Sequence, residues 1–104
     1  MTWSSLKPSL EALCDLWELA APPGATRGIV WHKYALASLY GDDRAVLRLT
    51  RIQLDVLYQD PEDPLPEDVL ALLDVTDVTI TAEPDISYDP DYAAMRCILQ
   101  IEVL

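Results

Sequence analysis

The fold is decided by residues 45–58, which read AVLRLTRIQLDVLY. In the second half of this run, apolar Ile52, Leu54 and Val56 alternate with polar side chains. A period of two is typical of a strand with one buried face and one solvated face, and a helical period fits these residues poorly. We therefore expect a strand over residues 45–58.

A second strand is expected directly before the first one. Gly28–Tyr40 is rich in Ile, Val, Trp and Tyr, which favour strands. Between the two strands, Tyr40-Gly41-Asp42-Asp43 is typical of a turn, because Gly and Asp tolerate unusual backbone angles. The two strands are therefore expected to form an antiparallel hairpin.

Toward the N-terminus, Ser5–Ala20 is expected to form a helix. Its apolar residues recur three or four positions apart, which gives one apolar stripe. Pro8 suits a first helical turn, where its missing N–H has no helical partner to lose. The following Ala21-Pro22-Pro23-Gly24 ends the helix, because prolines and a glycine do not continue it.

Toward the C-terminus, the hairpin is followed by a stiff acidic connector, Asp60–Pro66. Its prolines fix backbone angles and exclude regular structure. A short second helix is then expected to start at Leu65 or Pro66, with Glu67 and Asp68 at its positive end.

The remaining residues are expected to form two strands separated by a loop. Val75–Glu83 contains strand-forming residues and ends at Pro84, and Asp85–Asp91 reads as an acidic loop. Tyr92–Leu104 alternates between apolar and polar residues, which predicts a final strand. The side chains expected to point inward from it are Met95, Cys97, Leu99, Ile101 and Val103.

These elements predict an α+β fold in the order α-β-β-α-β-β. Its four-stranded sheet, antiparallel or mixed, is packed by the N-terminal helix and by the short second helix. A chain of 104 residues and 11.6 kDa is long enough for one hydrophobic core. We therefore expect a single domain over residues 1–104.

The charge of the chain is divided unevenly. The formal net charge is −11, and residues 53–104 hold thirteen acidic side chains and a single basic one, Arg96. Residues 1–52 hold five acidic and six basic side chains. This balance disfavours specific binding to nucleic acid through a basic face. The sequence also predicts no membrane span and no signal peptide.

The sequence offers few residues that could carry catalysis or bind a metal. His32 is the only histidine, and no nucleophile lies near it in sequence, so we expect no catalytic residue and no enzyme. The spacing of Asp85, Ser87, Asp89 and Asp91 is superficially that of a calcium loop, but it lacks the central glycine and the distal glutamate. We therefore expect no metal and no cofactor.

Two cysteines, Cys14 and Cys97, leave two alternatives. They are either reduced thiols in a reducing compartment or one disulfide, if the first helix packs against the last strand.

Several stretches also resemble a known pattern, in order along nearly the whole chain. They are Met1-Thr2-Trp3, Pro22-Pro23, Tyr40-Gly41-Asp42-Asp43, Arg51–Tyr58 and Leu99–Leu104. In this order they are similar to the small tail-completion or tail-terminator proteins, also described as minor tail proteins, of long-tailed bacteriophages and prophages. Gly41 and Asp43 stand where the turn of that family usually has Ala and Asn.

The resemblance implies a structural virion protein. Such a protein would form a ring, commonly of six copies, that closes the head-proximal end of the tail tube. Its partners would be itself, the tail tube protein and the head–tail connector, and DNA would pass through an acidic lumen without specific binding. It would be found in the virion tail and, during assembly, in the host cytoplasm.

A ring needs two different complementary patches on each copy, and the charge division supplies a candidate pair. The exposed loops at 40–44 and 84–91 are further candidate contacts. The candidate interface residues are Arg44, Arg48 and Arg51 against Glu62, Asp63, Glu67 and Asp68, together with Tyr40, Asp42, Asp43 and Tyr88.

Two alternative functions stay open at this point. One is a different head–tail neck or connector component. The other is an acidic adaptor or inhibitor that mimics the charge of DNA.

Overall fold

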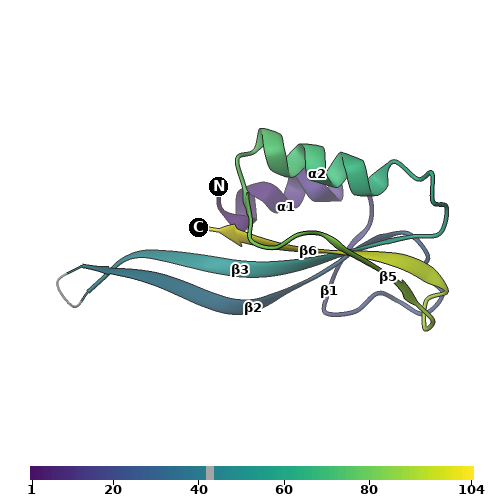
Figure 1. Cartoon of the computed structure of the whole chain (residues 1–104), viewed down its shortest axis with the longest axis horizontal. Helices are drawn as coiled ribbons and strands as arrows, with labels where there is room; N and C mark the ends of the chain where they lie inside the picture. Colours follow the sequence, from purple (N-terminus) through teal and green to yellow (C-terminus); the bar gives the residue numbers. More distant parts are fainter. Residues whose placement is uncertain (42–43) are drawn as a thin grey trace.

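The computed structural model describes residues 1–41 and 44–104, with side chains described for residues 1–34 and 49–104. It is an α+β domain with a mixed sheet of six strands, in the order β1-β2-β3-β6-β4, and β5 also pairs with β6. Two helices lie on one face of this sheet (Figure 1). The elements are α1 (Trp3–Glu11), β1 (Leu16–Glu18), β2 (Gly28–Gly41), β3 (Arg44–Tyr58), α2 (Leu65–Val75), β4 (Thr79–Ile80), β5 (Asp85–Asp89) and β6 (Ala94–Val103).

The expected hairpin is confirmed as β2 and β3, which pair antiparallel along almost their whole length. In the body of the domain Trp31 faces Leu54, and farther out Ser38 faces Arg48. The predicted turn includes Asp42 and Asp43, which lie outside the described residues. The final strand and the start of the second helix at Leu65 are confirmed as well.

The core lies between the helices and one face of the sheet. β3 and β6 alternate as predicted, because every second residue of each strand points at α1 and α2. Met95 is half-buried at the margin of this core. The buried residues are Leu6 and Leu10 from α1, Leu65, Val69 and Leu73 from α2, and Ile29, Trp31, Ile52, Leu54, Val56, Tyr58, Cys97, Leu99, Ile101 and Val103 from the sheet.

The first helix is shorter than predicted, because the chain forms β1 instead of continuing the helix. Leu16–Glu18 pairs parallel with Ile29–Trp31. This places Leu16 in the core under the helices and Trp17 in a small cluster on the other face. Neighbouring residues of a strand point to opposite faces of the sheet, so β1 packs Leu16 on one face and Trp17 on the other. A helix would have placed these apolar residues on one continuous stripe.

The pairing of β1 with β2 brings the Trp17 ring directly against the backbone of Gly28. The Trp17 ring lies so close to Gly28 that a Cβ on residue 28 would come within 2.4 Å of the ring, and Gly28 has a φ of +147°. Only glycine meets both conditions without strain.

The start of the first helix also differs from the prediction. Thr2 caps α1, with its hydroxyl accepting from the Ser5 N–H at 3.2 Å. Pro8 therefore lies inside the helix rather than in its first turn. Its missing N–H leaves the carbonyl of Ser4 without the usual helical donor.

The region between α2 and β6 was predicted wrongly in two places. Helix α2 runs on to Val75, and the strand expected over Val75–Glu83 shrinks to β4. The Thr76 hydroxyl donates to the Leu72 carbonyl at 2.7 Å and helps to close the helix. The expected acidic loop is largely a strand, because Asp85–Asp89 pairs with β6 as β5.

The β2–β3 hairpin extends well past the rest of the domain (Figure 1). Pairing of β3 with β6 begins at Thr50, and β1 pairs with β2 only at Ile29–Trp31 among the described residues. Farther out, the described parts of β2 and β3 pair with each other alone. The result is an elongated molecule of 50 × 26 × 23 Å, with the protruding hairpin at one end of its long axis.

Candidate functional site

The predicted basic patch follows β3 along the hairpin. Arg44 and Arg48 occupy paired positions of its protruding part, facing Gly41 and Ser38 in the register; their side chains lie outside the described residues. Arg51 lies at the root, where its Nε donates to Glu102 on β6 at 2.9 Å. Arg51 is thus joined to a carboxylate of its own chain.

The predicted acidic patch lies at the opposite end of the molecule, where the connector enters α2 (Figure 1). Glu62, Glu67 and Asp68 are exposed there. Asp63 is held within the chain by Arg27, whose Nε and Nη2 donate to its two oxygens at 2.8 and 3.1 Å. Asp63 Oδ1 also accepts from the N–H of Leu65, the first residue of α2, at 2.9 Å.

The Arg27–Asp63 pair shifts both titrations. The hydrogen bond from the guanidinium lowers the pKa of Asp63 below its ordinary value of 3.8. The same hydrogen bond raises the pKa of Arg27. Asp63 is therefore ionised at neutral pH, and its charge serves the fold of its own chain. Among the side chains that the structure describes, Glu62, Glu67 and Asp68 form no such ion pair.

The predicted loop contacts have different outcomes. Tyr40 lies in β2 opposite Ala45, and its side chain is outside the described residues, as are Asp42 and Asp43 altogether. Tyr88 lies in β5 rather than in a loop, with 60% of its surface exposed. Tyr88 is thus available on the molecular surface as predicted, on a strand at the margin of the sheet.

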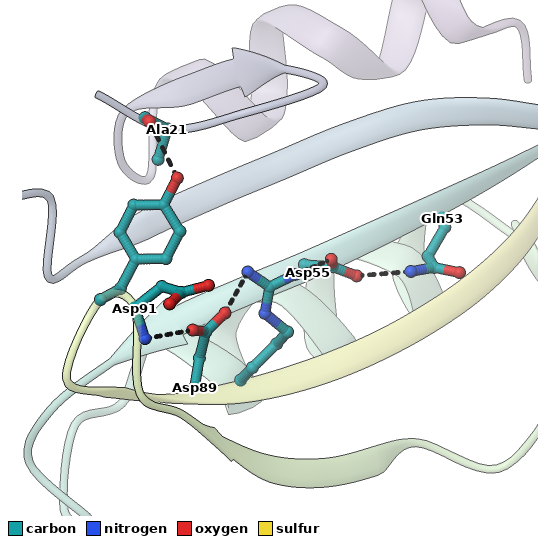
Figure 2. Close-up of polar contacts among 7 residues, drawn as sticks. Ala21, Gln53, Asp55, Asp89 and Asp91 are labelled. Atoms are coloured by element: carbon teal, nitrogen blue, oxygen red, sulfur yellow. Dashed lines mark hydrogen bonds and ion pairs between the residues drawn. The ribbon is translucent and has the colours of Figure 1, made fainter. Parts of the chain in front are cut away.

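A charge network that the sequence did not reveal lies on the sheet face away from the helices (Figure 2). Arg96 of β6 donates through Nη1 to Asp55 of β3 and through Nη2 to Asp89 of β5. Gln53 Nε2 donates to the other oxygen of Asp55 at 2.9 Å. The Asp91 N–H donates to Asp89 Oδ1 at 2.9 Å, which ties the β5–β6 turn to the same network.

This network holds the far end of the sheet together. Asp55 is 4% exposed, and a buried carboxylate is tolerated when a cation and hydrogen-bond donors satisfy it. One guanidinium therefore links three strands, and it fixes the position of β5 at its C-terminal end. A sequence signal did exist, because Arg96 is the single basic residue after Arg51. Its partners could not be found from sequence, because they depend on the strand register.

The described residues offer little chemistry beyond ion pairing. His32 is half-buried in β2, and its ring lies 6.4 Å from that of Tyr34. Within residues 1–41 and 44–104, no group of three or more His, Cys, Asp or Glu side chains is arranged to hold a metal ion. In the same ranges, no helix is both long and apolar enough to cross a membrane.

Cys14 and Cys97 are both free thiols and form no disulfide in this structure. Burial is the main cause that raises the pKa of Cys14 to about 11, and burial also raises the pKa of Cys97. Both thiols are therefore protonated at neutral pH and are poor nucleophiles.

Comparison with protein-family models, with curated proteins and with solved structures finds no match for this chain.

Proposed function

We propose that this chain is a structural subunit that associates with itself into a ring and completes or terminates the tail tube of a long-tailed bacteriophage at its head-proximal end. In the ring it would join the tube to the head–tail connector. The observation that carries the proposal is the protruding β2–β3 hairpin, which stands clear of a domain whose core is otherwise closed by two helices.

A protruding hairpin is suited to contact a neighbouring molecule. Along the outer edges of its two strands, backbone N–H and C=O groups form no hydrogen bonds to any other described strand of the chain. Such unpaired edges readily pair with another chain. A long arm on a small domain is therefore better explained by assembly than by the stability of the isolated domain.

The charge distribution supports a head-to-tail contact. The hairpin carries Arg44, Arg48 and Arg51, and the opposite end of the long axis carries the acidic connector and the start of α2. Contacts between two different patches repeat around an axis and close a ring when the rotation allows it. Opposite charges at the two ends favour that arrangement over contacts between like ends.

The first test is the mass of the protein by light scattering after size exclusion, over a concentration series and at low and high salt. We expect an assembly whose mass is a multiple of 11.6 kDa, with six copies expected from the family resemblance. High salt should shift it toward the monomer. A monomer at every concentration up to about 1 mM, the range of the weakest specific contacts, would overturn the proposal.

A second test addresses the tail itself. Purified tail tubes of the phage or prophage that encodes the chain are incubated with the protein and examined by electron microscopy. We expect density at one end of each tube and a block to further tube growth. A stable ring that leaves both tube ends bare would contradict the tail role while leaving self-association intact.

A further inference from the structure

Strand β5 is an open edge of the sheet. Asp85–Asp89 pairs with β6 along one side, and no strand in residues 1–41 or 44–104 pairs with its other side. Its apolar residues are uncovered, because Ile86 is 57% and Tyr88 60% exposed. An exposed edge with alternating apolar residues is a ready template for an added strand.

The neighbouring part of the same edge is protected, which sets β5 apart. β4 and β5 lie along the same side of β6, but Ile80 faces Ile101 and Asp85 faces Ile98. From Ile80 to Asp85 the chain advances five positions while the paired residues of β6 differ by three positions, so the edge strand is interrupted, and the interruption contains Pro84. Prolines are among the devices that prevent an edge from pairing. On this side of β6, the longest described stretch of open edge is thus the five residues of β5, against the two residues of β4.

The β5 edge is also held in place before any partner arrives. Asp89 at its end is bound to Arg96, and Arg96 is bound in turn to the buried Asp55. A strand that is already ordered loses less conformational entropy when it binds. This network therefore favours strand addition at β5.

The charges around β5 indicate what chemistry its partner has. Glu83, Asp85, Asp89 and Asp91 lie on the edge or flank it, with no basic residue among positions 83–91. Asp89 is neutralised by Arg96, which leaves an excess of negative charge. An added strand should therefore be basic.

The protruding part of the hairpin fits this description. Positions 33–49 carry Lys33, Arg44 and Arg48 against two acidic residues, Asp42 and Asp43. At about 3.3 Å per residue, the described outer stretch of β3, residues 44–49, spans roughly 20 Å and β5 roughly 17 Å. Within one molecule the described outer part of the hairpin and β5 lie toward opposite ends (Figure 1), so the two can meet through different copies.

We infer that the open edge of β5 receives the protruding part of the β2–β3 hairpin of a second copy as an added strand. This inference rests on the proposed self-association and names its two surfaces. It assigns β5 to the acidic side of the contact, at the same end of the molecule as the connector that leads into α2 (Figure 1). The added strand would cover Ile86 and Tyr88 and would place the hairpin arginines beside Asp85 and Asp91.

The experiment measures assembly by light scattering for variants of both surfaces. On β5, the double variant Ile86→Lys/Tyr88→Lys should raise the dissociation constant at least about tenfold. Leu19→Lys is the matched control, because Leu19 is 74% exposed but lies outside β5, and it should assemble like the wild type. Circular dichroism should confirm that all three chains are folded.

A charge exchange tests the pairing of the two surfaces. Arg44→Glu/Arg48→Glu and Asp85→Lys/Asp91→Lys should each weaken assembly, and the chain carrying all four changes should recover it. Failure of the wild type to assemble would overturn the proposed function. Normal assembly of the β5 variants, with a wild type that assembles, would overturn this inference alone. Absence of recovery in the exchanged chain would also contradict it.

Discussion

The body of the domain and the protruding hairpin are built from the same two strands but under different constraints. In the body, β3 is paired on both sides, by β2 and by β6, and its inward residues are covered by two helices. Between Thr50 and the outer end of the hairpin, the described residues of β2 and β3 pair with each other and with no other described strand. A two-stranded ribbon alone is marginally stable in water.

This difference separates stability from assembly. The free energy of unfolding should depend on the body, where apolar area is buried. The hairpin should contribute mainly to contacts with other copies. Substitutions in the body should therefore change stability, and substitutions in the hairpin should change assembly.

The largest effect on stability is expected in the core of the body. Leu54 is fully buried in β3, so Leu54→Ala should lower the free energy of unfolding by about 2–5 kcal/mol. Urea unfolding followed by circular dichroism measures this change. A loss below about 1 kcal/mol would show that the body is less tightly packed than described.

A slightly smaller effect is expected from the charge network. Arg96→Met removes the cation that satisfies Asp55, whose side chain is 6% exposed, and should cost about 3 kcal/mol. Arg96→Lys keeps the charge but loses the two-pronged geometry, so it should fall between the wild type and Arg96→Met. Equal stability of Arg96→Met and the wild type would mean that the network does not support the sheet.

The Arg27–Asp63 pair should contribute less, because the Arg27 side chain is 47% exposed. After allowance for solvent screening, Asp63→Asn should cost about 0.5–1 kcal/mol at neutral pH. The lowered pKa of Asp63 sets the sign of the pH dependence. Its contribution is present above its ordinary pKa and is lost as the pH falls through the lowered value.

Thermal unfolding of the wild type and Asp63→Asn over a pH series tests this. The difference between the two should be largest near neutral pH and should vanish in strong acid. A difference that grows on acidification would contradict the assigned ion pair.

The smallest effect is expected at the root of the hairpin. The Arg51 side chain is 43% exposed in its pair with Glu102, so Arg51→Gln should change stability by no more than about 0.5 kcal/mol. Because Arg51 is engaged within its own chain, Arg51→Gln should also weaken assembly less than Arg48→Gln does. The reverse order in light scattering would place Arg51 at the contact itself.

Sequence periodicity predicted the central elements because their signals are local. The alternation at Ile52, Leu54 and Val56 results directly from burial of one face of β3. The identity of β1 could not be predicted, because Leu16 and Trp17 satisfy a helical stripe equally well until β2 provides a partner edge.

The candidate interface residues were likewise predictable only where the signal is local in the sequence. Tyr88 follows from the expectation of an exposed loop at 84–91, and the hairpin arginines follow from the division of charge; their roles as contacts stay predictions. The acidic residues of Asp85–Asp89 disfavour a strand and predict a loop, although Ile86 and Tyr88 alternate with polar neighbours. The partners of Arg96 and Asp63 depend on which strands and loops meet in space, and the sequence alone does not specify this.

The central claim is that copies associate through the protruding hairpin while the body folds without it. The direct measurement compares the wild type with a variant in which Asn-Gly replaces residues 38–48, closing the hairpin at the pair Ala37–Leu49. Both are studied by light scattering at low salt and by thermal unfolding. We expect an assembled wild type and a folded, monomeric variant with a similar melting temperature. A shortened variant that still assembles like the wild type would contradict it.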